Sequence, residues 1–332
     1  MATHAVILLN LGAPDSMKSI APFLYNLFRD PDLFTFPFNN LFASLVSRLR
    51  TLQNRKQYMA IGGKSPLLGH TIVQARMLEE KLKPYISAKV YIGMRYWHPL
   101  IEEALKAAVR DNAEKFIFLP LYPQYSLTTT GSSINEAKRL LKKQKLDNIK
   151  ITTIKSYADN EFFTKAHRLR IEESLSTLLD EDLKSLAVIF SAHGIPSKFI
   201  DKGDIYLDEV KRSMNAIVSS LKTQSLYKEA FNNSITTHLS FQSKVGPIKW
   251  LKPSTIDIVK RLAQEGIENL VVVPISFVSD HMETLFELRL ALKETAIKKG
   301  VKKFMVVKAL NDSDPFIEAL KNIILEAISN EQ

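Results

Sequence analysis

Short apolar runs alternate with amphipathic stretches along this chain, and the alternation restricts the fold more than any other feature. The runs have the length of buried strands, and the stretches between them, such as residues 71–82, 99–113 and 254–265, have the length and spacing of crossover helices. Parallel sheets covered by helices on both faces produce this pattern. We therefore predict a three-layer, doubly wound α/β fold with strands at residues 5–9, 90–92, 116–119, 187–190, 235–239, 270–273 and 304–307.

The two halves of the chain also repeat one another. AVILLNLGAP at residues 5–14 aligns with AVIFSAHGIP at residues 187–196, so Leu11 in the first half takes the place of His193 in the second. At matched positions one half offers Leu and Thr, whereas the other offers His, Asp and Glu. Two further matches lie at strand ends: the strand before Pro120 with the strand before Pro274, and residues 90–99 with residues 237–247.

A chain of 332 residues is too long for one ordinary core. We predict two similar domains, residues 1–155 and 156–311. Ligands of open α/β sheets bind beyond the carboxyl ends of the strands, so two such sheets facing each other would enclose one shared cleft. The sequence thus predicts an apolar wall opposite a wall of ionisable groups.

Composition excludes several classes of protein. Hydrophobic residues make up 45% of the chain and charged residues 24%, as in a soluble globular protein. No run approaches the length of a membrane span, and the amino end lacks the pattern of a signal peptide, so we expect a cytoplasmic protein. Because the chain has no Cys, it has no disulfide, no thiolate metal site and no Cys-held iron–sulfur cluster. Any metal must be held by His and oxygen ligands.

A net charge of +10 is compatible with nucleic acid, an anionic membrane or an acidic small substrate. The densest basic stretches, residues 138–145 and 298–303, fall at expected helix ends or connections. A solvated surface is the simpler interpretation of such runs, so we expect no nucleic-acid partner.

His193 ends an apolar strand and is followed at once by Gly and Ile-Pro. This places an ionisable ring at the carboxyl end of a strand rather than inside the sheet. A second polar group lies in residues 274–288, where Glu283 and Glu287 are one helical turn apart. Their mutual repulsion would be relieved by a metal ion or a proton. Asp280 is equally well explained as a helix N-cap, and Glu287 as a surface carboxylate.

Other motifs fail. Residues 10–15 have one Gly where a dinucleotide-binding loop needs three, and the P-loop-like Gly63-Lys64-Ser65 has Tyr58 where the first Gly belongs. The chain has neither a G-x-S-x-G elbow nor an H-E-x-x-H helix. An iron triad of His193, His281 and Glu283 is conceivable, but a pair of ligands is the simpler claim.

Several motifs give the chain a resemblance to the ferrochelatases, which insert ferrous iron into a porphyrin to complete heme. The resemblance runs nearly end to end. It is carried by LNLGAP at 9–14, IGGKSP at 61–66, GMRYWHP at 93–99, YPQYS at 122–126, TTGSS at 129–133, SAHGIP at 191–196, FQSKVGP at 241–247 with Trp250, and FVSDHMETL at 277–285.

This resemblance implies site residues. His193 would take the pyrrole protons or hold the incoming Fe2+, a substrate, and Glu283 would be its partner. Asp280, His281 and Glu287 would form a polar path for protons or metal. The first domain would form the porphyrin bed, although Leu and Phe at helical spacing are more often core. The implied porphyrin-binding residues are Leu11, Phe23, Leu24, Leu27, Tyr122, Tyr125, Ser243, Trp250 and Phe277, with Arg50, Ser65, Arg95 and Tyr96 for the propionates.

Departures from some ferrochelatases refine the expectation. Members from animal mitochondria carry a transit segment and a Cys-bound [2Fe-2S] cluster, which this Cys-free chain lacks, so a bacterial form without a prosthetic group is implied. The QSKVGP block indicates protoporphyrin IX as the substrate. Coproporphyrin III or another divalent metal remains an alternative, as does a carrier that binds a tetrapyrrole or iron without turnover. We expect a monomer whose carboxyl-terminal segment, residues 312–332, packs on the first domain.

Residues 23–42 are unusually aromatic for a segment interrupted by Pro and Asn. They would form either a lip that contacts the membrane to receive an apolar substrate or a lid over the porphyrin. Basic neighbours favour weak peripheral contact with anionic lipid at the inner face of the membrane. The residues concerned are Phe34, Phe36 and Phe38, with Arg48, Arg50, Arg55 and Lys56 nearby.

Overall fold

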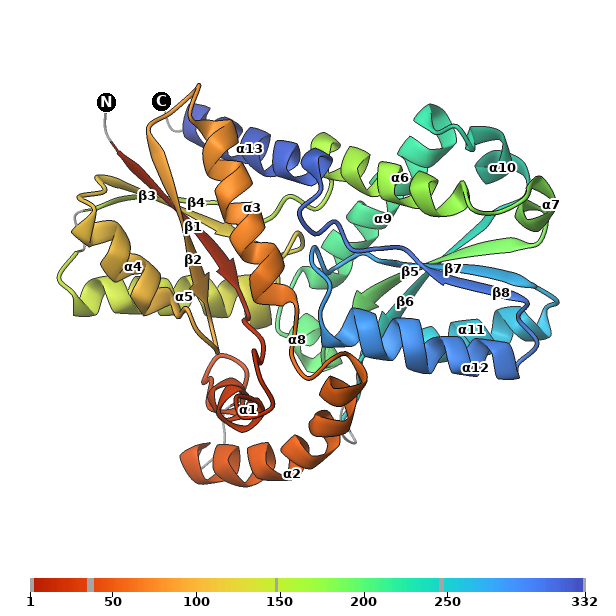
Figure 1. The fold of residues 1–332 in the computed structure, drawn as a ribbon, viewed down its shortest axis with the longest axis horizontal. Coiled ribbons are helices and arrows are strands. Elements are labelled where there is room, and N and C mark those ends of the chain that lie inside the picture. The colour runs from red at the N-terminus through yellow and green to blue at the C-terminus, as the bar shows by residue number, and fades with distance from the viewer. Residues whose placement is uncertain (1–2, 35–38, 147–148, 245–247, 331–332) are drawn as a thin grey trace. The chain divides into compact units, whose positions relative to one another are not determined.

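Each half of the chain builds a four-stranded parallel sheet with helices on both faces (Figure 1). The computed structural model describes residues 3–34, 39–146, 149–244 and 248–330. The chain divides into a first unit, Met1–Tyr157 with Asp312–Gln332, and a second unit, Ala158–Asn311. The doubly wound α/β fold predicted from the alternating runs is therefore confirmed. Among the helices in the described ranges, none is both long and apolar enough to cross a bilayer.

The first unit has the strand order β2-β1-β3-β4. Its strands are β1 (His4–Asn10), β2 (Ala88–Met94), β3 (Lys115–Pro120) and β4 (Lys150–Thr153). Its helices are α1 (Ile20–Phe28), α2 (Asn39–Ala60), α3 (Leu67–Leu82), α4 (Ile101–Arg110), the short π-helix η1 (Leu127–Gly131), α5 (Ser132–Lys143) and α13 (Asp314–Ser329). The carboxyl-terminal α13 lies beside α3 and also contacts β4 (Figure 1).

The second unit has the matching order β6-β5-β7-β8. Its strands are β5 (Leu186–His193), β6 (Thr236–Gln242), β7 (Asn269–Pro274) and β8 (Lys303–Val306). Its helices are α6 (Glu161–Leu175), α7 (Asp180–Leu183), α8 (Ser197–Asp201), α9 (Tyr206–Gln224), α10 (Lys228–Asn233), α11 (Thr255–Gln264), the π-helix η2 (Glu283–Leu292) and α12 (Lys293–Lys298).

Strand register shows that the repeat in the sequence is a repeat in the structure. Leu9 of β1 lies opposite Pro120 of β3, and Ser191 of β5 lies opposite Pro274 of β7. Since the sequence alignment pairs residue 9 with residue 191, the two prolines occupy the same place in the two sheets. A π-helix also follows the third strand of each unit in chain order.

Alternating side chains of the central strands supply separate cores on the two faces of each sheet. In the second unit Val188 and Phe190 pack toward α6 and α9, whereas Ala187 and Ile189 pack toward α11 and η2. Both faces are covered, so these strands read as unbroken apolar runs and are fully buried. Rigid strands therefore carry the loops at their carboxyl ends.

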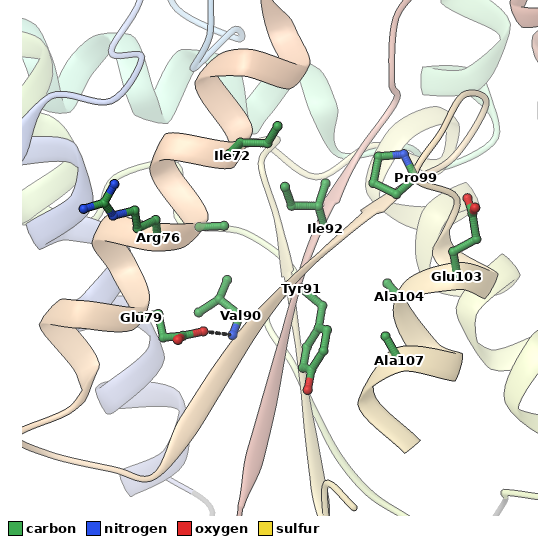
Figure 2. A pocket seen from close by; sticks show the side chains of 11 residues that line it. Ile72, Arg76, Glu79, Val90, Tyr91, Ile92, Pro99, Glu103, Ala104 and Ala107 are labelled. Carbon is green, nitrogen blue, oxygen red and sulfur yellow. Dashed lines mark hydrogen bonds between the residues drawn. The ribbon is translucent and has the colours of Figure 1, made fainter. Parts of the chain in front are cut away.

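A groove of about 510 Å³ runs along β2, the edge strand of the first unit, between α3 and α4 (Figure 2). Its walls are mostly apolar, with Ile72, Val90 and Ile92 among them. The Glu79 carboxylate accepts a hydrogen bond from the Val90 N–H at 2.8 Å, which satisfies a donor at the open edge of the sheet. The groove contains none of the predicted site residues.

Candidate active site

His193 is the last residue of β5, and side chains from two other segments hold its backbone. The Ser276 hydroxyl, in the loop after β7, accepts a hydrogen bond from the His193 N–H at 2.7 Å. The Tyr206 hydroxyl, at the first residue of α9, donates to the His193 carbonyl at 2.9 Å. Ser276 and Tyr206 are themselves buried, so they fix His193 at the carboxyl end of the sheet.

Gly194 is required by the close approach of its neighbours. A Cβ at this position would lie 2.7 Å from the Gln242 carbonyl oxygen and 3.4 Å from the Trp250 ring. The Gly194 N–H donates to that same carbonyl at 2.8 Å. Trp250, a predicted porphyrin contact, therefore packs against the segment that leaves His193.

The imidazole of His193 is neutral at neutral pH, and one of its ring nitrogens makes no hydrogen bond among the described residues. Burial lowers its pKa below the ordinary value of 6.5, and the negative charge of Glu283 opposes this only in part. Nδ1 is buried and has no hydrogen-bond partner within the described part of the chain. A neutral ring with an orphaned nitrogen can accept a proton or bind a metal ion.

Glu283, the first residue of η2, forms an ion pair with His281. His281 Nε2 lies 3.0 Å from Glu283 Oε2, and His281 Nδ1 lies 3.0 Å from the Ser279 carbonyl oxygen. Both partners are acceptors, so the ring donates from both nitrogens as an imidazolium. Burial disfavours the charge on each group, but the attraction between them outweighs it. The pKa of His281 is raised and that of Glu283 is lowered.

Phe277 packs between the two histidines. Its ring centroid lies 5.6 Å from that of His193 and 4.2 Å from that of His281. Both contacts are with ring edges or tilted rings rather than stacked faces. Phe277 thus links His193 and His281 through ring contacts.

Glu287 is a second carboxyl group in this cluster, and its ionisation differs from that of Glu283. Burial, and then the negative charge of Glu283, raise the pKa of Glu287 to about 7. The Ser243 hydroxyl donates to Glu287 Oε2 at 2.5 Å. Partial protonation of Glu287 at neutral pH therefore eases the repulsion expected between the two glutamates, and this partly buried, hydrogen-bonded residue is not a solvated surface carboxylate.

Asp280 is neither a cap nor a surface group. The residue before η2 is Met282, which makes no side-chain cap. The buried Asp280 carboxylate instead accepts hydrogen bonds from the Thr284 hydroxyl at 2.9 Å and from the Asn311 amide at 2.9 Å, and it pairs with Arg289 at 3.3 Å. Its role in a proton or metal path stays a prediction.

Across the ranges that the structure describes, no three His, Asp or Glu side chains form a group that could hold a metal ion. An iron triad of His193, His281 and Glu283 therefore has no support. His281 Nε2 faces the Glu283 carboxylate, which leaves His193 and Glu283 as a nitrogen and an oxygen donor. Two such donors suit a ferrous ion that is held only briefly.

Three of the predicted residues of the first unit, Leu11, Tyr96 and Tyr122, lie at the carboxyl end of its sheet. The Tyr96 N–H donates to the carbonyl of Leu11, which follows β1, at 2.9 Å. The Leu121 N–H, just after β3, donates to the Leu9 carbonyl at 2.8 Å and so brings the following Tyr122 to the same edge. That Leu11 faces His193 stays a prediction, since the two belong to different units.

Some of these residues are core rather than surface. The Tyr96 side chain is 1% exposed, and its hydroxyl donates to Asp30 at 2.6 Å, so it already has a buried partner and its contact with a propionate stays a prediction. Arg95 also binds Asp30, at 3.0 Å, and keeps a small exposed surface. Leu24 is 5% exposed and packs in the interior as amphipathic spacing would suggest, so it is not a surface contact.

The remaining first-unit residues stay predictions. Tyr122 is 8% exposed, so only a small part of its ring is accessible. Phe36 and Phe38, like residues 245–247 of the QSKVGP block, lie outside the described residues. For five other predicted porphyrin-binding residues, the geometry neither favours nor opposes a porphyrin contact. They are Phe23 and Leu27 on α1, Arg50 on α2, Ser65 and Tyr125.

Residues that were not predicted also shape the site. Ser276 and Tyr206 fix His193, and Thr284, Arg289 and Asn311 fix Asp280. The position of Ser276 just after β7 could have indicated a site residue, because ligands bind at strand ends. Asn311 is 31 positions from Asp280 and gives no local signal.

Comparison with solved structures places the fold among the chelatases. The sirohydrochlorin chelatase SirB from Bacillus subtilis subspecies spizizenii, solved with cobalt, superposes with a TM-score of 0.53 over 99% of this chain and 97% of that one, at 13% identity. SirB from Bacillus subtilis with Fe3+ gives a TM-score of 0.56 at 14% identity, covering 100% of this chain and 97% of that one. The two matching parallel sheets of this chain therefore define a chelatase-like fold.

Sequence comparison identifies the family. The family model named Ferrochelatase matches residues 3–328. A ferrochelatase of Aquifex aeolicus is 40% identical over 319 residues, covering 96% of this chain and 97% of the relative. One of Gloeobacter violaceus is 38% identical over 332 residues, covering 98% of each. The chain belongs to the ferrochelatase family, the metal chelatases of heme biosynthesis.

Proposed function

We propose that this chain inserts Fe2+ into protoporphyrin IX, with His193 and Glu283 as the groups that act on the reacting atoms. The observation that carries the proposal is the partly buried, neutral imidazole of His193, whose buried Nδ1 has no hydrogen-bond partner among the described residues, together with an ionised Glu283. A carrier needs an apolar surface, whereas this pair adds a base and an oxygen donor.

The protonation states fit the balance of the reaction. Metallation removes two pyrrole protons and adds one Fe2+, so the porphyrin core keeps its charge. Neutral His193 can accept a proton or hold the iron, and ionised Glu283 supplies an oxygen ligand. Glu287, with a pKa of about 7, can receive a proton at neutral pH and release it to solvent. His281 keeps Glu283 ionised by pairing with it.

Anaerobic incubation with Fe2+ and each of protoporphyrin IX and coproporphyrin III, followed by absorbance, tests the proposal. We expect metalloporphyrin from protoporphyrin IX at the higher kcat/KM. A higher kcat/KM for coproporphyrin III would assign the chain to the other substrate. Binding of porphyrin with no metal insertion by the folded protein, with Fe2+, Co2+ or Zn2+ alike, would make it a carrier.

We further propose that α2 contacts the surface of an anionic membrane. Its exposed apolar side chains recur at helical spacing along one face, and the helix has basic residues but no acidic one. These side chains are Leu41 at 73%, Leu45 at 60%, Leu49 at 63%, Leu52 at 70% and Met59 at 68% exposure, with Arg48, Arg55 and Lys56 on the same helix. Such a surface suits a protein that receives an apolar substrate.

Flotation with anionic vesicles tests the membrane proposal. A Leu45→Gln, Leu49→Gln variant should lose most of its vesicle binding, while a control variant at the exposed Ile256 of α11, Ile256→Gln, keeps it. Equal binding by the variant and the wild type would overturn the proposal. Light scattering of the protein without vesicles tests the predicted monomer.

A further inference from the structure

The loop between β7 and η2 is held by one residue from a distant part of the chain. Asn311 donates its N–H to the Val278 carbonyl at 2.7 Å. Its side-chain Oδ1 accepts the Asp280 N–H at 2.8 Å, and its Nδ2 donates to Asp280 Oδ2 at 2.9 Å. Three hydrogen bonds thus fix the last residues before the His281–Glu283 pair.

From Asp280 the contacts continue directly into the site. The Asp280 carboxylate accepts a hydrogen bond from the Thr284 hydroxyl, and that same hydroxyl oxygen accepts the His281 N–H at 3.0 Å. The first turn of η2, which contains Glu283, is therefore anchored through Asp280. Arg289 neutralises the buried carboxylate from the next turn of η2.

Asn311 is suited to this place by its conformation. Its φ of +49° lies in the left-handed region, which Asn and Gly adopt more readily than other residues. The residue is 8% exposed, so its amide hydrogen bonds are shielded from water. Asn311 lies between the end of β8 at Val306 and the start of α13 at Asp314, so it belongs to neither element.

We propose that Asn311 is a positioning residue for metal insertion, which orients Glu283 and His281 through Asp280. The inference rests on the proposed function, because it assigns Asn311 an effect on the same reacting groups. Residues that orient metal ligands from behind typically contribute about 10- to 100-fold to affinity or activity.

Asn311→Gly removes the amide but keeps the backbone conformation, so it isolates the side chain. We expect kcat to fall about tenfold and the KM for Fe2+ to rise, with the Kd for protoporphyrin unchanged. The matched control is Asn112→Gly, since Asn112 has a φ of +56° and lies just after α4 in the first unit. This control should keep wild-type kinetics. Rates are normalised to porphyrin-binding sites, so that partial unfolding does not imitate a loss of turnover.

A second variant pair tests the contact itself. Asn311→Asp places two carboxylates together and should lose more activity than Asn311→Gly. Adding Asp280→Asn exchanges the amide and the carboxylate, and the double variant should recover part of the lost kcat. A kcat per site within twofold of wild type in Asn311→Gly, or no recovery in the exchange, would overturn the inference. If Glu283→Gln also retained full activity, the role proposed for Glu283 would be wrong. If Glu283→Gln lost activity and Asn311→Gly did not, the inference about Asn311 would fail and the proposed function would stand.

Discussion

At neutral pH the ionisable side chains around His193 carry different charges although they lie in one cluster. His193 is neutral, His281 and Glu283 form a charged pair, and Glu287 titrates near pH 7. Burial alone would neutralise all four groups. The ion pair is what separates them, because it stabilises two charges and leaves beside them a neutral base, His193, and an acid, Glu287, that is only partly ionised at neutral pH.

The first residue-scale prediction concerns Glu287. A proton acceptor works only above its pKa, so with a pKa of about 7 its contribution to kcat should increase as the pH rises from 6 to 8. Glu287→Gln should remove this part of the pH dependence, while the exposed Glu294→Gln on α12 keeps it. A pH series of initial rates measures the effect. Parallel profiles for Glu287→Gln and the wild type would show that Glu287 passes no protons.

The second residue-scale prediction concerns His167 on α6. This residue is 2% exposed, and its Nε2 has no hydrogen-bond partner among the described residues. Burial lowers its pKa from 6.5 to about 3. Between these values the unfolded chain binds a proton that the folded chain does not, so the free energy of unfolding decreases as the pH falls. The decrease reaches about 1.4 kcal/mol per pH unit.

His167→Leu should therefore lose less stability than the wild type between pH 6.5 and pH 4. Urea unfolding at each pH measures the difference. The surface variant His98→Leu is the control and should follow the wild-type profile. An unchanged acid dependence in His167→Leu would mean that His167 is not buried as a neutral ring.

At the scale of elements, the site depends on how closely β5, β6 and the loop at residue 250 approach one another. Gly194→Ala would place a Cβ 2.7 Å from a backbone carbonyl, which cannot move without shifting β6. We expect a loss of about 1–3 kcal/mol of stability and a lower kcat, because His193 is the adjacent residue. Gly69→Ala in α3, where a Cβ meets nothing within 4 Å, is the control and should be neutral or stabilising. Normal kcat in Gly194→Ala would show that His193 tolerates movement of its strand end.

How far the sequence predicts these elements depends on their burial. The central strands were found because they are apolar on both faces. β4 was missed, because its sequence KITT has one large apolar residue and lies at the edge of its sheet. His193 and Glu283 were singled out from a strand end and from helical spacing, and the roles that the family resemblance gives them stay predictions. Asn311 and Tyr206 could not be predicted from the sequence, because the residues that they contact are distant in sequence.

The whole molecule consists of two sheets with the same strand order and the same register, yet with different chemistry at their carboxyl ends. The ionisable cluster belongs to the second unit alone. The first unit presents Leu11 where the second presents His193, and its buried polar group, Asp30 with Arg95 and Tyr96, is internally satisfied. Duplication of one fold therefore explains how a base and an apolar surface arise from equivalent positions.

Single-turnover insertion of Fe2+ by His193→Ala tests the central claim most directly. Protoporphyrin binding should stay close to that of the wild type, while the rate of metal insertion falls by about 10²- to 10⁴-fold. His238→Ala, on the neighbouring strand β6, is the control and should insert iron at the wild-type rate. Wild-type insertion by His193→Ala would contradict the account.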